Sequence, residues 1–353
     1  MRFIGNKENL LDNIHQVVLS TGINSGVFCD FFSGTANVGR FFKKKGFQII
    51  SSDLLYFSYV LQEAYIRNNL EPSFKKLLSK IKPDKVALLM TPLELVCSYL
   101  NNLNGKKGFI YKHYTIEGTA DSKSPRRYFT GENGMKIDAI RQQIEEWKSH
   151  KLTKESEYYI LLACLIESVP FYANISGVYA AFLKTYDPRA LKKLAIRPIQ
   201  IHQGVGENKV FNKNSMDLVS NLEADILYLD PPYNERQYAP NYHLLETIAK
   251  YDNPEIRGIT GMRNYDNQKS EFCNEKSALQ ALDRIARESK YKYLLLSYNS
   301  EGIMPQNAIE STLGKYGDVQ LIEIDYRRFR SNSNGDAPNK KLIREQIYLL
   351  RHR

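Results

Sequence analysis

The sequence is poor in the features that mark secreted, membrane and zinc-binding proteins. Its 353 residues contain four cysteines (Cys29, Cys97, Cys164 and Cys273) that lie far apart, without a C-x-x-C pair. This spacing argues against a disulfide framework and a zinc site, and it suits a reducing cytoplasm. No apolar run approaches the roughly 20 residues of a membrane span, and the opening MRFIGNKENLL lacks a signal-peptide layout. We therefore predict a cytoplasmic protein with no membrane segment and no metal.

Acidic residues are in the minority. The chain has 49 Lys and Arg against 39 Asp and Glu, a net charge of +10. An excess of positive charge favours polyanionic partners, because each neutralised phosphate releases counterions. Many basic proteins bind no nucleic acid, so the charge alone decides little. The content of 42% hydrophobic and 25% charged residues is ordinary for a folded chain, and the length predicts two domains or one with a large insertion.

Short segments of high β-propensity alternate with helical patterns, which predicts a doubly wound α/β sheet. The expected strands are Val27–Phe32, Gln48–Ser52, Lys209–Phe211, Ile226–Asp230, Tyr293–Ser297, Val319–Tyr326 and Gln346–Leu350. The loop between the last two is too short for a crossover helix, so they should pair antiparallel. We predict a seven-stranded sheet whose last strand is reversed.

A stretch of different character separates the second and third expected strands. Residues 69–205 are far longer than an ordinary loop and look mostly helical. Ile137, Ile140, Ile144 and Trp147 form one apolar helix face, and 157–172 has the composition of a buried helix. We predict that 69–205 is an inserted domain, and that 1–68 and 206–353 together form the sheet domain.

The motif Asp230-Pro231-Pro232-Tyr233 comes directly after the expected strand ILYLD. Two prolines cannot continue the ladder, so the carboxylate should lie at the carboxyl edge of the sheet, where ligands bind in open α/β folds. A carboxylate, a proline carbonyl and an aromatic ring suit a planar base with an exocyclic amine. The alternative is an ordinary strand-ending turn.

A glycine-punctuated turn follows the first expected strand, in the segment DFFSGTANVG from Asp30 to Gly39. Such a turn lets a nucleotide-like ligand approach the backbone. Arg40 stands where an NTPase loop requires lysine, and the G-x-G-x-x-G pattern is missing. Asp53 ends the next strand, where acidic residues bind ribose hydroxyls, although it is equally suited to cap the following helix.

Taken in order, FIGNKENLL (3–11), DFFSGTANVG (30–39) and DPPY (230–233) resemble the N6-adenine-specific DNA methyltransferases. The resemblance is to the D12-like, alpha-type subgroup that includes the Dam enzymes. It implies a Rossmann-like sheet of the S-adenosylmethionine-dependent type, with target recognition in 69–205. It also implies S-adenosyl-L-methionine as methyl donor, S-adenosyl-L-homocysteine as product and no metal. The expected partner is double-stranded DNA, in a bacterial or phage-type, nucleoid-associated cytoplasm. The methylation would serve either a restriction–modification system, with a cognate endonuclease as a candidate further partner, or host marking. We expect a monomer or weak dimer.

Carried over residue by residue, the resemblance assigns catalysis to Asp230, Pro231, Pro232, Tyr233 and Lys7. Asp230 and the Pro231 carbonyl would hold a flipped adenine on which Tyr233 stacks. The implied cofactor site contains Phe3, Ile4, Lys7, Asp30, Phe31, Phe32, Ser33, Gly34, Thr35, Asp53, Leu54, Asn214, Ser215 and Asp230. Many relatives carry an acid where this chain has Asn214, with Asp217 three residues later, so the contact to the cofactor adenine stays open.

Basic and polar residues in three segments are candidates for DNA contact, with a solvated charged surface as the alternative. They are Arg126, Arg127, Asn234, Arg236, Gln237, Tyr238, Arg328 and Arg330. Two other functions stay open, namely methylation of cytosine N4 and a catalytically silent DNA-binding module, and RNA is a weaker candidate substrate. Relatives that act on cytosine more often have Ser where this chain has Asp230, which favours adenine.

Overall fold

A computed structural model describes residues 4–82, 89–327 and 342–353 of the chain. The fold consists of two compact units, which we treat separately. The sheet unit comprises 4–62, 203–239 and 266–353, and the helical unit comprises 63–202 and 240–265.

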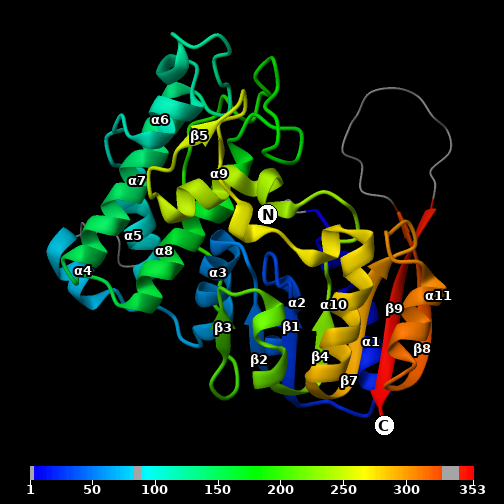
Figure 1. Cartoon of the computed structure of the whole chain (residues 1–353). Coiled ribbons are helices and arrows are strands. Elements are labelled where there is room, and N and C mark those ends of the chain that lie inside the picture. The colour runs from blue at the N-terminus through cyan, green and yellow to red at the C-terminus, as the bar shows by residue number, and fades with distance from the viewer. Residues whose placement is uncertain (1–3, 83–88, 328–341) are drawn as a thin grey trace. The chain divides into compact units, whose positions relative to one another are not determined.

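The sheet unit is built on seven strands in the order β3-β2-β1-β4-β7-β9-β8 (Figure 1). Their bounds are β1 Gly26–Phe31, β2 Phe47–Ser52, β3 Lys209–Phe211, β4 Glu223–Leu229, β7 Lys290–Asn299, β8 Gly317–Arg327 and β9 Leu342–His352. The first five of these in the spatial order pair parallel, whereas β9 runs antiparallel to both β7 and β8. The predicted seven-stranded sheet with a reversed last strand is confirmed.

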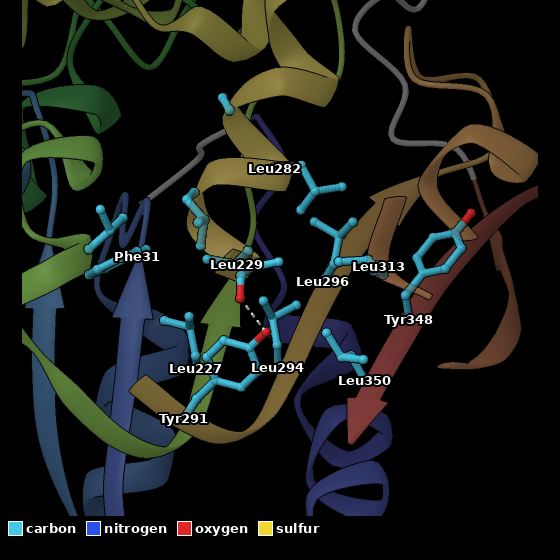
Figure 2. Close-up of a cluster of buried hydrophobic side chains, with 14 of the residues drawn as sticks. Phe31, Leu227, Leu229, Leu282, Tyr291, Leu294, Leu296, Leu313, Tyr348 and Leu350 are labelled. Atoms are coloured by element: carbon cyan, nitrogen blue, oxygen red, sulfur yellow. Dashed lines mark hydrogen bonds between the residues drawn. The ribbon is translucent and has the colours of Figure 1, made fainter. Parts of the chain in front are cut away.

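One face of this sheet carries an aliphatic core. Side chains alternate along a strand, and Phe31, Leu229 and Leu296 on three neighbouring strands are all buried on the same side. Helices α10 (Glu275–Glu288) and α11 (Gln306–Leu313) cover this face, to which they contribute Leu282 and Leu313 (Figure 2).

The opposite face is aromatic and becomes polar toward the carboxyl ends of the strands. Phe28 of β1 stacks on Phe42 of α2 (Asn37–Lys44), with ring centroids 4.0 Å apart, and lies 5.9 Å from Tyr228 of β4. Asp30 is two residues beyond Phe28 and pairs in register with Tyr228, so it projects from this same face. Helix α1 (Leu11–Ser20) packs here through His15, which meets Phe42 edge-on, and α3 (Tyr56–Gln62) follows β2.

The helical unit contains the predicted helices of the insertion. Its elements are α4 Lys75–Ile81, α5 Pro92–Asn101, α6 Phe109–Tyr114, α7 Gly131–Ser149, α8 Glu155–Ser168, α9 Tyr238–Lys250, which enters the unit at Pro240, and a hairpin of β5 Ile256–Arg257 and β6 Met262–Arg263. Ile137, Ile140, Ile144 and Trp147 are buried along α7, which confirms the predicted apolar face, and α8 is buried along most of its length.

Residues 240–265 lie in the helical unit, although the sequence alone assigned them to the segment 206–353. The reason is a set of polar contacts with residues about a hundred positions away. Arg141 donates to the carbonyls of Ile248 and Ala249, and the Tyr251 hydroxyl donates to Asp138 at 2.6 Å. Strand and helix patterns carry no information on such long-range bonds, and the small β5–β6 hairpin was likewise not predicted.

Candidate active site at the carboxyl edge of the sheet

Asp230 leaves the sheet directly after β4, because the strand ends at Leu229 and two prolines follow. On β1, the neighbouring strand, Asp30 is the second-last residue. The turn of the DPPY motif is fixed at its far end, where the Ile303 N–H donates to the Tyr233 carbonyl at 3.0 Å. The Tyr233 ring packs, partly buried, against the aliphatic core. The two aspartates that the sequence singled out therefore lie at one edge of the sheet.

A buried lysine connects Asp230 to a second carboxylate. The Lys7 ammonium lies 3.3 Å from Asp230 Oδ1 and 3.2 Å from Glu345 Oε2, and Lys7 is only 4% exposed. A hydrogen bond of 2.7 Å from Asn37 Nδ2 to Asn6 Oδ1 fixes the N-terminal segment beside the glycine loop.

In the cluster of Lys7, Asp230 and Glu345, the pKa values of both Asp230 and Lys7 lie above their ordinary values. Burial raises the pKa of Asp230 to about 6, since Lys7 lowers it less than burial and the nearby Glu345 together raise it. Burial lowers the pKa of Lys7, but Asp230 and Glu345 outweigh burial and hold the pKa above its ordinary value. The lysine is therefore charged at neutral pH, whereas Asp230 titrates close to neutrality.

The glycine loop is folded around the carboxylate of Asp30. Its Oδ2 accepts hydrogen bonds from Ser33 Oγ and from the Gly39 N–H, both at 3.0 Å. Burial raises the pKa of Asp30 to about 7, and repulsion from Asp230 and Asp53 adds to this effect. Thr35 is buried in the same loop, and Phe32 adopts a positive φ of 62° where the chain turns away from β1.

Asp53 also binds this loop. Its Oδ2 accepts from the Gly34 N–H and its Oδ1 from the Leu55 N–H, each at 2.8 Å. The contact to Gly34 links the ends of β1 and β2 and was not predicted. Phe31, in contrast, points into the aliphatic core (Figure 2), on the opposite face of the sheet from Asp30.

At the end of β3, Asn214 is joined to an acid that sequence reasoning missed. Its Nδ2 lies 3.3 Å from both carboxylate oxygens of Glu271, which begins a short 3-10 helix (Glu271–Cys273). The next residue, Phe272, meets Phe32 edge-on with ring centroids 5.2 Å apart. Ser215, the residue after Asn214, is buried. The sequence does not reveal the pairing of Asn214 with Glu271, because Glu271 lies 57 residues after Asn214.

Several residues predicted to contact DNA make internal hydrogen bonds. Gln237 exchanges two bonds with the Ser270 backbone, and the Asn234 side chain accepts from the Arg236 N–H at 2.9 Å. The Arg236 side chain is exposed. A Cβ at Gly5 would come within 3.2 Å of the Tyr238 hydroxyl, so that ring lies against the N-terminal segment.

In the helical unit, Arg126 donates to the carbonyls of His113, Gly258 and Ile259, at 3.2, 3.1 and 3.0 Å. Arg127 donates to the Lys184 carbonyl. Phe3, Arg328 and Arg330 lie outside the described residues. The assignments of all these residues to cofactor or DNA stay predictions.

Comparison with known proteins identifies the family to which this site belongs. A family model for the D12 class of N6 adenine-specific DNA methyltransferases matches residues 3–312, which is most of the chain. The chain belongs to this family. The matched range contains the DPPY motif, the glycine loop and the N-terminal lysine of the site.

Relatives of this D12 methyltransferase are named as type II methyltransferases or as modification methylases. The type II methyltransferase M.FokI of Planomicrobium okeanokoites is 42% identical over 99% of this chain and 52% of its own length. M.NlaIII of Neisseria lactamica is 38% identical over 96% of both chains, and the modification methylase StsI of Streptococcus sanguinis is 37% identical over 99% of this chain and 52% of its own. The chain thus spans about half the length of the first and third relatives.

None of the helices in the described parts of the chain has the length and apolar character needed to span a membrane. No cluster of three or more His, Cys, Asp or Glu side chains is arranged there to hold a metal ion.

Proposed function

We propose that this chain transfers a methyl group from S-adenosylmethionine to the N6 amine of adenine, at a specific sequence in double-stranded DNA. The observation that carries the proposal is the carboxylate of Asp230, held at the edge of the sheet by a buried lysine and followed by Pro231, Pro232 and Tyr233. Family membership and the names of the type II relatives support a role in restriction–modification. The reaction would take place in the cytoplasm, on cellular or phage DNA, with a cognate endonuclease as partner system.

The charge of the site suits a cationic cofactor. Two carboxylates, Asp230 and Glu345, pair there with the Lys7 ammonium, and a third, Asp30, lies close enough to Asp230 to repel it. S-adenosylmethionine, when bound, supplies a methyl group activated by the positive sulfonium. We propose that Asp30 and the loop Phe32–Thr35 hold its methionine end and that Asp53 holds its ribose. Glu271, presented by Asn214, would accept the adenine amine.

Asp230 would activate the target amine. The lone pair of adenine N6 is delocalised into the ring, which makes the amine a poor nucleophile. Asp230 and the Pro231 carbonyl could accept its two N–H bonds and would favour a pyramidal nitrogen with an available lone pair. The bound cofactor would supply the methyl group and leave as the neutral thioether S-adenosylhomocysteine, and Asp230 could take the proton that the methylated amine releases. Holding the two reactants in attack geometry can contribute about 7–11 kcal/mol.

The target base would have to leave the duplex to reach Asp230. Flipping costs a few kcal/mol, and stacking on Tyr233 would return about 1–3 kcal/mol of this. We propose that the helical unit, which includes residues 69–202 of the predicted insertion, reads the DNA sequence, and that Arg236 contacts the DNA backbone.

The direct test is methyl transfer from labelled S-adenosylmethionine to unmodified duplex DNA, followed by mass analysis of the nucleosides. We expect the label in N6-methyladenine. Label in N4-methylcytosine would show that the target base is cytosine and not adenine. An absence of affinity for S-adenosylmethionine would favour a silent DNA-binding module. Cofactor binding without transfer would instead point to an RNA substrate, a recognition site missing from the DNA used or a missing partner subunit.

A further inference from the structure

Glu345 is a buried acid of the site to which neither the motifs nor the proposed chemistry assigns a role. It lies in β9 and is 7% exposed. Its Oε2 accepts a hydrogen bond from Lys7 Nζ at 3.2 Å, and its Oε1 accepts from Asn299 Nδ2 at 3.3 Å. Asn299 is its register partner on β7 and is itself buried. The backbone pairing of β7 with β9 therefore fixes this carboxylate against the lysine.

The Lys7 ammonium pairs with two carboxylates, those of Asp230 and Glu345. Lys7 contacts Asp230 only through Oδ1, at 3.3 Å. Within the described residues, Asp230 has no other hydrogen-bond or ion-pair partner, so its Oδ2 is left as an acceptor. An ammonium has three N–H donors and can turn toward either acid, and Glu345, anchored by Asn299, holds one of those donors away from Asp230.

We infer that Glu345 is a positioning residue for methyl transfer, which restrains the Lys7 ammonium and so keeps Asp230 available to accept the target amine. This inference rests on the proposed function for its consequence in catalysis. Its structural part, the competition of Glu345 and Asp230 for Lys7, can be measured on the protein alone.

The charges around Asp230 give the direction of the effect. Lys7 faces it from the N-terminal segment, Asp30 from β1, Tyr228 from β4 and Glu345 from β9. Glu345 raises the pKa of Asp230, and Lys7 lowers it. Without the charge of Glu345, Lys7 would bond fully to Asp230, lower its pKa and occupy its acceptor, which would weaken Asp230 as a partner for the amine.

The experiment compares Glu345→Gln with wild type and with Glu323→Gln. Glu323 is an exposed acid on β8 whose carboxylate pairs with Arg344, so this control removes a charge from the same sheet outside the site. Proteins carrying 13C-labelled aspartate carboxyls are titrated by NMR, and Asp230→Asn assigns the Asp230 signal. We expect the Asp230 midpoint to fall by roughly one pH unit in Glu345→Gln and to stay in place in Glu323→Gln.

Catalysis gives the second readout. In Glu345→Gln we expect the acid limb of the kcat profile to move to lower pH with the Asp230 midpoint, and kcat at pH 8 to fall about tenfold. The affinity for S-adenosylhomocysteine should change little. Glu345→Asp keeps the charge one methylene further away, so its shift should have the same sign and be smaller, and it serves if Glu345→Gln does not fold.

An unchanged Asp230 midpoint in folded Glu345→Gln and Glu345→Asp would overturn the inference. So would a kcat that falls in Glu345→Gln without any change in the pH profile, because that pattern indicates a merely structural carboxylate. If wild type transfers no methyl group, the proposed function fails instead, and the NMR titration still decides whether Glu345 competes for Lys7.

Discussion

Two acids, Asp138 of the helical unit and Asp230 of the sheet unit, are bonded in opposite ways. In the helical unit, Asp138 accepts four hydrogen bonds, from the N–H groups of Gly108, Ile110 and Tyr111 and from the Tyr251 hydroxyl. In the sheet unit, Asp230 shares one ammonium with Glu345. A buried charge whose acceptors are all used stabilises its surroundings, whereas a buried charge with unused acceptors costs stability. Unused acceptors, as at Asp230, are therefore expected where a bound ligand supplies the missing hydrogen-bond donors.

The largest effect should come from removing the under-partnered carboxylate. We expect Asp230→Ala to lower single-turnover methyl transfer at least about 10³-fold, because the acceptor for the amine is lost. Affinity for S-adenosylhomocysteine should stay within a few-fold of wild type. The matched control is Asp318→Ala, an exposed acid of β8 that should behave as wild type. Transfer by Asp230→Ala within tenfold of wild type would remove Asp230 from the mechanism.

The fully bonded carboxylate should show the converse pattern. Asp138→Ala leaves three N–H groups and a hydroxyl without their acceptor, of which the Ile110 N–H is buried and the others are partly buried, and we expect it to cost about 3 kcal/mol of stability or more. Asp121→Ala, an exposed acid of the same unit, should change stability by less than about 0.5 kcal/mol. Calorimetry with and without S-adenosylhomocysteine measures both. Equal melting temperatures for the two variants would contradict the structural role of Asp138.

The pH dependence of stability should differ in sign between two buried groups, Asp30 of the sheet unit and His243 of the helical unit. The pKa of Asp30 is raised to about 7 from 3.8, so the folded state binds the proton more tightly and gains stability as pH falls from 7 toward 4. Burial lowers the pKa of His243, in the helical unit, to about 4 from 6.5, so the folded state loses stability as pH falls through that range.

Melting curves at pH 5 and pH 8 separate the two groups. Relative to wild type, Asp30→Asn should be more stable at pH 8 and lose most of this advantage at pH 5. The stability of His243→Gln relative to wild type should instead be higher at pH 5 than at pH 8. Parallel curves for both variants would show that neither group carries the predicted linkage.

The smallest effects concern two arginines. Arg126 donates to three backbone carbonyls, two of them at the tip of the β5–β6 hairpin. We expect Arg126→Ala to speed amide exchange in 256–263 about tenfold without changing the salt dependence of DNA binding. Arg236 is exposed, and Arg236→Ala should reduce the salt slope by about one charge and leave stability unchanged. A changed slope in Arg126→Ala alone would reverse the two assignments.

The sequence predicted the parts of the fold and site that depend on local pattern. The seven strands and the placement of Asp230 after β4 follow from β-propensity and from two prolines that end a strand. Glu345 was missed because its place depends on β9 lying between β7 and β8, which puts it opposite Asn299. Glu271 and residues 240–265 were missed for the same reason, since their neighbours are set by hydrogen bonds across long sequence separations.

The most direct test of the contrast between Asp230 and Asp138 measures stability and methyl transfer in one isosteric variant, Asp230→Asn. Because ionised Asp230 is costly to bury, with a pKa raised to about 6, we expect the variant to melt a few degrees above wild type at pH 8. Its methyl transfer should fall at least about 10²-fold, with S-adenosylhomocysteine binding retained. Transfer at the wild-type rate, or a lower melting temperature together with lost transfer, would contradict the account, because Asp230 would then be a structural residue like Asp138.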